Sequence, residues 1–570
     1  MNRMKKGGVW ILCLIVLASA SLWAQGKTEA AAGQGTVVVT PVGTYPVVTK
    51  PVSLSFLTMQ PVYIEDFTTN RFAQYLEDKT GVDIKWETIP RDAVKEKLNI
   101  ILASGDYPDV FFGLGRQEQG IGASQEMTYG VQEGMFLPLN DLIDTYMPNL
   151  SKLLDERPGI RQFLTSPDGN IYSLPDFNEC YHCTVSQKVW VYQPWLDALG
   201  LKMPTTTDEF YQMLVAFRDK DPNGNGKKDE IPYAGAISGW NNTPETFLLN
   251  SFIYSNLVAS LDASPSSAIG FYRDGNTIRT MVNTPEYRDS LSYMAKLYRE
   301  GLIYAASYTQ NSDQLTQLVE GPKEPIVGVV AGGYGGMFSI VGGERYQNFR
   351  LLAPLKGPSG AQYARFFTQE PVIGNVVISK TCKNPEVVAR LVDYLYSDEG
   401  TLMSNYGFEG EGWEWAKDGD VGLDGKKAIY KLLKAWNDMD PQNDCFVMLG
   451  VRENTSTIRN GEAVNPDVNL YSSEGLEALL YQKSAELYSP YAHPELEIPT
   501  LRFLDDEETA FASKKVAYAN YVRQSLVKFV TGAWSVDSDW NQYIQGLDKL
   551  DLNGILGINQ KAYNRQNGSN

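Results

Sequence analysis

Strand-like and helix-like segments alternate near the start of the chain, and this alternation restricts the fold more than any other feature of the sequence. Residues 52–57 and 82–87 show the period-two pattern of strands, and residues 110–112 form a short apolar run. Apolar residues at helical spacing fill the two intervals, at 69–79 and 92–103. In a β-α-β-α-β series each helix crosses over between parallel strands. We therefore predict a mostly parallel, doubly wound α/β sheet in this region.

A similar alternation recurs later in the chain. Beyond residue 410 the pattern becomes mainly helical, and the 570 residues are enough for two or more domains with large cores. The predicted strands are 190–192 and 372–379, and the predicted helices are 207–220, 285–300, 385–396 and 507–530.

The N-terminus has the pattern of a secretory signal peptide. Basic residues precede an apolar stretch at 9–20, and Ala24 offers a small-residue cleavage site. We predict a signal peptide over 1–24 and a flexible linker over 25–50, which is rich in Gly, Ala, Thr and Val. An uncleaved anchor helix is the alternative, but the apolar stretch is short for a membrane span.

The predicted location follows from the same region. Cys13 lies inside the apolar stretch and is not placed for lipid attachment, and no run of eighteen apolar residues occurs after residue 24. We predict a periplasmic or secreted protein with a cleaved signal peptide and no lipid anchor. The formal net charge of −18 and the pI near 4.8 argue against nucleic acid and anionic membranes as partners, because both are bound by basic patches.

Catalytic motifs are scarce. After residue 24 the only histidines are His182 and His493, so a Ser-His-Asp triad or a histidine-rich catalytic metal site lacks its residues. The glycine-rich run at 332–336 has no Lys-Ser/Thr after it and is not a phosphate loop. We predict that the protein is not an enzyme. The alternative is a secreted carboxylate-dependent glycoside hydrolase, which needs only two of the 68 acidic residues.

Residues 221–232 read Asp-Pro-Asn-Gly-Asn-Gly-Lys-Lys-Asp-Glu-Ile-Pro. Oxygen-bearing side chains at alternate positions, followed by a glycine, can wrap a loop around Ca²⁺, which takes about six to eight oxygen ligands. Pro232 stands where an EF-hand has its bidentate glutamate, so the two carboxylates before it would complete the shell. We predict one structural Ca²⁺, with a metal-free Asn/Gly turn as the alternative. The predicted ligands are the side chains of Asp221, Asn223, Asn225, Asp229 and Glu230 and the carbonyl of Lys227.

Four cysteines follow the leader: Cys180, Cys183, Cys382 and Cys445. An even number in an oxidising compartment permits two disulfides, but the sequence does not give their pairing. The close pair around His182 also has the spacing of half a zinc site or of a redox pair, although no second close pair follows. We predict structural disulfides or buried thiols.

Aromatic residues make up 12% of the chain. Trp86 and Trp195 lie on periodic apolar faces, so we predict that they belong to the core. Trp240, Trp413 and Trp415 stand in loops beside Gly, Asn or Glu. Because a ring in a loop can stack on a ligand, such as the apolar face of a sugar, we predict that these three contact a ligand, with partial burial as the alternative.

Several motifs occur in a characteristic order along the chain. They are ASGDYPDVF at 103–111, DGNIYSLP at 168–175, WLDALGL at 195–201, PTTTDEF at 204–210, the loop at 221–232, ISKTCKNPE at 378–386, NYGFEG at 405–410, FVTGAW at 529–534 and WNQY at 540–543. In this order they resemble the extracellular solute-binding proteins of carbohydrate ABC transporters. The similarity is strongest to alginate-oligosaccharide-binding proteins and to the large solute-binding lipoproteins of Gram-positive bacteria, and it extends from about residue 51 to the end.

The resemblance implies an α/β fold of the two-lobed, type II-like periplasmic-binding-protein kind, with doubly wound sheets joined by a hinge. The N-terminal lobe would comprise 51–172 and 372–412. The C-terminal lobe would comprise 173–371 and 413–570 and would contain the calcium loop.

The resemblance also implies a function and further site residues. Tyr406 and Glu409 match a sugar-facing Tyr-Gly-x-Glu-Gly run of the family, and Tyr129 matches another ligand-facing tyrosine less closely. The implied function is that of a monomeric receptor that captures an oligosaccharide and delivers it to the membrane permease of an ABC transporter.

Overall fold

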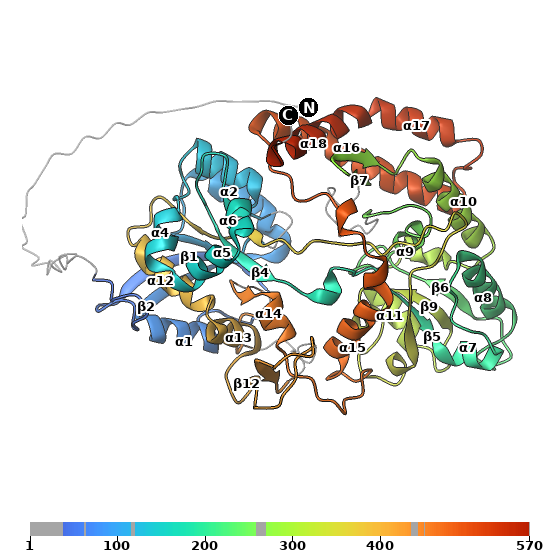
Figure 1. The fold of residues 1–570 in the computed structure, drawn as a ribbon, viewed down its shortest axis with the longest axis horizontal. Helices are drawn as coiled ribbons and strands as arrows, with labels where there is room; N and C mark the ends of the chain where they lie inside the picture. The colour runs from blue at the N-terminus through green and yellow to red at the C-terminus, as the bar shows by residue number, and fades with distance from the viewer. Residues whose placement is uncertain are drawn as a thin grey trace, which may run out of the picture.

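The computed structural model describes residues 38–61, 64–115, 120–257, 270–434, 443–447, 449 and 451–568. These residues form two α/β lobes, each built around a sheet of its own (Figure 1). The predicted two-lobed α/β fold is confirmed. The predicted signal peptide and the first part of the predicted linker lie outside the described residues.

The sheet of the first lobe begins with the predicted alternation. β1 (Val52–Gln60) pairs in parallel with β2 (Val82–Pro90) and β3 (Val110–Phe112), and the crossover helices are α1 (Arg71–Thr80) and α2 (Val94–Ser104). The sequence pattern located all five elements. Buried apolar residues on both sheet faces explain why these strands and helices pack into one core.

The other half of this sheet comes from distant parts of the chain. β11 (Val372–Ile378) runs antiparallel between β3 and β4 (Leu174–Asn178), and β14 (Glu453–Asn454) adds to β4 in parallel. The complete order is β14-β4-β11-β3-β1-β2. The sheet is therefore mixed, because β11 enters from the second lobe and runs in the opposite direction.

Helix α1 illustrates how local chemistry fixes an element. The Asn70 side chain accepts a hydrogen bond from the Ala73 backbone N–H at 3.0 Å, so the helix begins with a capped first turn. Phe72 and Leu76, one turn apart, are both buried. Gly81 ends the helix at a φ of 75°, a conformation that favours glycine.

The end of the predicted linker is folded onto this lobe. Val47 and Val48 are 0% and 3% exposed, and the Val47 N–H donates to the Thr80 carbonyl at 2.8 Å. The Arg390 guanidinium donates to the carbonyl oxygens of Thr40 and Thr44. The end of the predicted linker therefore differs from the expectation, because Val47 and Val48 are buried against the first lobe.

The sheet of the second lobe has the order β10-β5-β9-β6. β5 (Val189–Tyr192) is antiparallel to β10 (Phe349–Leu352) and to β9 (Val327–Ala331), and β6 (Ile231–Ala234) is parallel to β9. This sheet is mostly antiparallel. Helix α8 (Thr207–Asp219) precedes β6 and buries Phe210, Leu214 and Phe217 in the second core.

Further helices complete the two lobes. In the second lobe α10 (Pro285–Arg299) packs against the 27-residue α16 (Asp505–Thr531), whose C-terminal neighbours lie at the top of Figure 1. The remaining α-helices of the described residues are α3 (Ala123–Gln125), α4 (Asn140–Tyr146), α5 (Pro148–Glu156), α6 (Pro158–Leu164), α7 (Gln193–Leu199), α9 (Pro244–Leu249), α11 (Ser312–Glu320), α12 (Pro385–Leu395), α13 (Asp398–Tyr406), α14 (Ser456–Asn460), α15 (Leu476–Lys483), α17 (Trp540–Lys549) and α18 (Leu552–Gln566). Two small antiparallel sheets have two strands each, β7 (Phe271–Asp274) with β8 (Thr277–Thr280) and β12 (Trp413–Trp415) with β13 (Tyr430–Leu432).

The two cores correct the predicted lobe boundaries. Phe177 still belongs to the first core, and so do Trp413, Phe446 and Ile458, which were predicted in the second lobe. The reason is packing: the rings of Phe446 and Phe72 lie 4.9 Å apart, edge to face, in the first core. The chain passes from the first core to the second after 178, returns before 372 and passes over again after 458. Among the described residues, no helix has the length and apolar character of a membrane span.

Candidate functional site

A cavity of about 650 Å³ lies where the two lobes face each other. Residues of both lobes and of the segments that connect them form its wall. They are Asn178, His182, Cys183, Ser186, Trp240, Tyr334, Arg365, Phe367, Gln369, Asn405, Tyr406, Val447, Arg452, Asn454, Arg459 and Glu477. The volume lies in the range of small-molecule sites, and the wall combines rings with amides and charged groups, as such sites commonly do.

Trp240 forms the aromatic part of the wall on the side of the second lobe. Its ring lies 6.2 Å from the Tyr334 ring, and 39% of the residue is exposed. The backbone at Gly333 approaches this ring so closely that a Cβ there would meet Trp240 Cε3 at 2.3 Å. The absence of a side chain at Gly333 therefore leaves room for the indole of Trp240. This tryptophan, which the sequence places in a loop, lies at the cavity.

Tyr406 lines the opposite side, at the end of α13 in the first lobe. Its ring stacks on Tyr430 with 5.7 Å between centroids, and burial raises the pKa of its hydroxyl. Stacking on a buried ring holds Tyr406 in place. Two predicted ligand-contacting residues, Trp240 and Tyr406, thus face one cavity from different lobes.

The other predicted ligand residues lie elsewhere. Trp413 is 0% exposed and its Nε1–H donates to the Gly407 carbonyl at 2.9 Å, so the prediction that it contacts ligand is wrong. The glycine-rich flanks made it look like a loop residue, whereas it is part of β12 and of the first core. Glu409, Trp415 and Tyr129 do not line the cavity; Trp415 is 40% exposed, and Tyr129 packs against Phe136.

The charged residues of the wall were missed by the sequence analysis. Arg452 Nε donates to Asp176 at 3.2 Å, and Arg459 Nη2 donates to Glu477 at 3.1 Å. Arg365 lines the cavity from the segment that returns to the first lobe. These arginines come from segments far apart in sequence and belong to no local motif, so no sequence signal brought them together.

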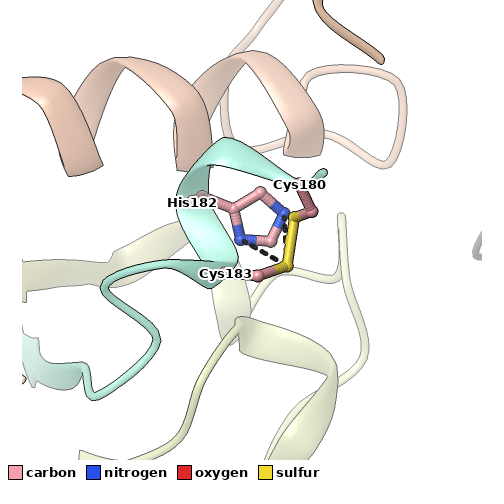
Figure 2. A group of neighbouring side chains, drawn as sticks. All are labelled: Cys180, His182 and Cys183. Atoms are coloured by element: carbon pink, nitrogen blue, oxygen red, sulfur yellow. Dashed lines mark hydrogen bonds between the residues drawn. A yellow bond between two sulfur atoms is a disulfide. The ribbon is translucent and has the colours of Figure 1, made fainter. Parts of the chain in front are cut away.

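The pair Cys180 and Cys183 forms a disulfide (Figure 2). Cys183 lines the cavity. The two sulfurs and the His182 ring lie within 4.8 Å of one another, but the sulfurs are bonded to each other. A disulfide was one of the two predicted states of the cysteines, and its pairing, which the sequence left open, comes from the structure. His182 Nε2 lies 3.5 Å from Glu477, and burial lowers the pKa of this histidine against the opposing effect of the glutamate. The buried Lys188 Nζ donates to the His182 carbonyl at 2.9 Å. This turn is thus held rigidly on the path between the lobes.

The other two cysteines, Cys382 and Cys445, are buried free thiols. Both belong to the first core, and burial raises the pKa of Cys382 to about 12. They correspond to the buried thiols of the prediction.

The predicted calcium loop connects α8 to β6 in the second lobe. The Asp221 carboxylate accepts from the backbone N–H groups of Asn225 and Gly226 at 3.1 and 3.0 Å, and Asn223 Oδ1 also accepts from Asn225 N–H at 3.0 Å. Asp221 and Gly226 have φ values of 47° and 74°. The chain therefore curls so that the side-chain oxygens of alternate residues converge.

Two carboxylates close the loop from the other side. Asp229 accepts from the side-chain amides of Asn223 and Asn225 at 3.1–3.2 Å, and Glu230 Oε1 is buried without a hydrogen-bond partner. Burial raises the pKa of Glu230, and the nearby carboxylates of Asp221 and Asp229 raise it further. A shielded carboxylate oxygen beside two like charges is the donor set that a hard divalent cation neutralises. The loop residues fit a Ca²⁺ site and do not line the cavity between the lobes.

A second cavity, of about 560 Å³, shares Phe367 with the first and extends toward α16. Its described lining contains Phe163 and Phe367 but no tyrosine or tryptophan. The first cavity therefore offers the better surface for stacking a polar ring compound.

Comparison with known proteins agrees with the two-lobed fold. Residues 62–402 match the family model described as bacterial extracellular solute-binding protein. The fructooligosaccharide ABC transporter substrate-binding protein FusA of Streptococcus pneumoniae is 27% identical over 535 residues, which are 90% of this chain and 90% of that protein.

Solved structures agree as well. FusA in complex with kestose superposes with a TM-score of 0.70 at 25% identity, over 90% of this chain and 99% of that chain. An HMO-binding, ABC-transporter-associated solute-binding protein from Bifidobacterium longum infantis gives 0.75 at 23% identity, over 92% and 100% of the chains. The alginate-binding protein AlgQ2, solved without calcium ion, gives 0.64 at 21% identity, over 91% and 99%. The solved FusA structures include an EF-hand mutant.

Proposed function

Because the chain belongs to the bacterial extracellular solute-binding proteins, we propose that it captures an oligosaccharide and delivers it to the permease of an ABC transporter. The observation that carries this proposal is the cavity between the lobes, where Trp240 and Tyr406 offer rings from opposite sides. Amides of Asn178, Gln369 and Asn454 line the same wall and suit the hydroxyls of a sugar. FusA, which is similar along nearly the whole chain, is a fructooligosaccharide-binding protein.

In this proposal the protein binds and releases the oligosaccharide without cleaving or modifying it. A panel of oligosaccharides, neutral and acidic, is titrated calorimetrically and then analysed for new reducing ends. We expect stoichiometric binding without turnover. Sustained formation of new reducing ends would instead support the alternative, a secreted glycoside hydrolase that uses two carboxylates.

Location and assembly complete the proposal. The family is extracellular, and the N-terminal pattern of the sequence supports export through a cleaved signal peptide to a periplasmic or external location. We propose a monomeric receptor. Fractionation of the producing cells would show in which compartment the protein is found. Light scattering would give its mass in solution and therefore its oligomeric state.

We further propose that the loop at 221–230 holds one structural Ca²⁺ through the side chains and the carbonyl predicted from the sequence. The convergence of Asp221, Asp229 and the unpartnered Glu230 oxygen supports this. When bound, the ion would neutralise these carboxylates and fix the connection from α8 to β6. It would brace the second lobe without touching the sugar.

A further inference from the structure

The charged residues of the cavity wall are mainly positive, in a chain whose net charge is −18. Three arginines, Arg365, Arg452 and Arg459, stand against one carboxylate, Glu477. This local excess of arginine is not expected from the overall composition. The low-dielectric walls of such a site strengthen the interactions of any charge that is left uncompensated.

Two of the arginines are already compensated. Arg452 Nε bonds to the buried Asp176 at 3.2 Å, and Arg459 Nη2 bonds to Glu477 at 3.1 Å. These pairs hold the wall in shape, because each guanidinium is fixed by a carboxylate of the protein itself. Of the three arginines in the described wall, only Arg365 then remains without a carboxylate partner.

Arg365 has no such partner among the described residues. It takes part in no ion pair within 4.0 Å there, and its Nε is buried without a hydrogen-bond partner. Burial lowers the pKa of Arg365, with only an opposing longer-range effect of Tyr254 and Glu497. The Glu497 carboxylate accepts instead from the backbone N–H and hydroxyl of Thr368, at 2.6 Å each.

The backbone around Arg365 is held on both sides. The Ala364 N–H donates to the Tyr491 carbonyl, and the Phe367 N–H donates to the Thr184 carbonyl, each at 2.8 Å. The guanidinium carbon lies 5.8 Å from the Phe367 ring, which rims the cavity. The Arg365 side chain thus reaches the cavity from a fixed segment of backbone. Its positive charge is buried away from water and is not paired with a carboxylate, and a bound anion would offset the free-energy cost of this burial.

We propose that the ligand is an acidic oligosaccharide, one that carries a carboxylate, and that Arg365 binds this carboxylate. The inference rests on the proposed function and narrows it to a substrate class. A guanidinium presents parallel N–H donors that match the two oxygens of a carboxylate, which a neutral sugar lacks. Trp240 would then stack on a sugar ring while Arg365 fixes its charge.

The test compares matched sugars and matched variants. Oligosaccharides of galacturonate, of alginate and of glucuronate are titrated beside their methyl esters and beside the neutral sugar kestose. The wild type should bind at least one acid form about ten- to hundredfold more tightly than its ester, as for a charged hydrogen bond of roughly 1.5–3 kcal/mol. Added salt should weaken the acid form and leave the ester unchanged.

The variant Arg365→Gln should lose this preference and bind acid and ester alike. Arg365→Lys keeps the positive charge but lacks the parallel N–H donors of the guanidinium. Its preference for the acid form should lie between that of the wild type and that of Arg365→Gln. The control is Arg279→Gln, which removes the same charge from an exposed pair with Asp274 outside the cavity and should behave as wild type. Melting curves would verify that each variant is folded.

The outcomes separate this inference from the proposed function. Tight binding of kestose or another neutral sugar with no uronate preferred overturns the acidic ligand and leaves the receptor intact. Binding of an acid form that Arg365→Gln does not weaken overturns the role of Arg365. Failure of every sugar to bind a folded protein overturns the oligosaccharide receptor and the inference with it.

Discussion

Removal of Ca²⁺ should destabilise the second lobe without affecting sugar affinity at temperatures well below melting. The variant that isolates this effect is Asp221→Asn, which removes one charge of the proposed site. It keeps one side-chain oxygen, which can still accept from the backbone N–H of Asn225, but it loses the second oxygen, which accepts from the Gly226 N–H. Asparagine tolerates the φ of 47° at this position. The variant is therefore compared with the wild type in chelator, where neither protein holds the ion. An equal Tm there assigns the loss of calcium sensitivity to the lost carboxylate, and a lower Tm shows that the turn is weakened.

The magnitude follows from the site. Three carboxylates, on Asp221, Asp229 and Glu230, against a divalent ion leave a charge of about −1, so the ion relieves most of their mutual repulsion. An ion present at about a hundredfold excess over its Kd adds roughly 2.7 kcal/mol to stability. Chelation should then lower the Tm by roughly 5–10 °C for a cooperative unit of about 150–250 residues, and by less for a larger one.

The assay is a melting curve with Ca²⁺, with Mg²⁺ and with chelator. Ca²⁺ should raise the Tm of the wild type and Mg²⁺ should do so weakly, because Mg²⁺ demands a tight octahedron. Asp221→Asn should melt alike in all three conditions. The control Asp219→Asn, whose carboxylate bonds to Arg218 at 2.7 and 2.8 Å, should keep the full response.

Two results would refute the reasoning. An unchanged wild-type melting curve after chelation would show that the loop is an Asn/Gly turn that binds no metal. Loss of sugar binding in a chelated but folded protein would place the ion at the ligand site, contrary to its position outside the cavity wall.

Three further predictions test the site and the core. Trp240→Ala should weaken sugar binding on the order of tenfold, measured by calorimetry, whereas Trp415→Ala, outside the cavity wall, should not. Saturating sugar should reduce the radius of gyration in X-ray scattering, because binding favours the closed lobes; an unchanged radius would indicate a rigid molecule. Burial raises the pKa of Glu245 from 4.5 to about 7, so wild-type stability should fall as the pH rises between these values. Glu245→Gln should therefore be more stable than wild type by about 3 kcal/mol at pH 8 and equal at pH 4, as urea unfolding would measure.

Local patterns predicted the elements better than their assembly. The strands and helices from β1 to β3 follow from their apolar patterns within a few residues, because each packs against its sequence neighbours in one core. The direction of β11 was not predictable in this way, since it depends on the path of the chain through the other lobe. Nor was the burial of Val47, whose partners lie at the end of α1.

The site shows the same division. The loop at 221–230 draws its converging oxygens from one short segment, so its spacing alone indicated the geometry that the structure has. The cavity wall draws on both lobes, and only Trp240 and Tyr406 of it were predicted. Arg365 has no partner within its own segment to mark it. Trp413 was predicted to contact ligand from a loop because its neighbours are glycine and glutamate, which are typical of loops. It lies instead in a short strand and is buried.

The middle of the first sheet is synthesised late. β3 ends at Phe112, and β11, which pairs with it, begins about 260 residues further on at Val372. Until then the edge of β3 is open, and an open strand edge is a template for wrong pairing. Closing so long a loop delays folding. A chain cut after residue 400 would lack Trp413, Phe446 and Ile458, which belong to the core of the first lobe. Truncation of the C-terminal part should therefore destabilise the first lobe as much as the second.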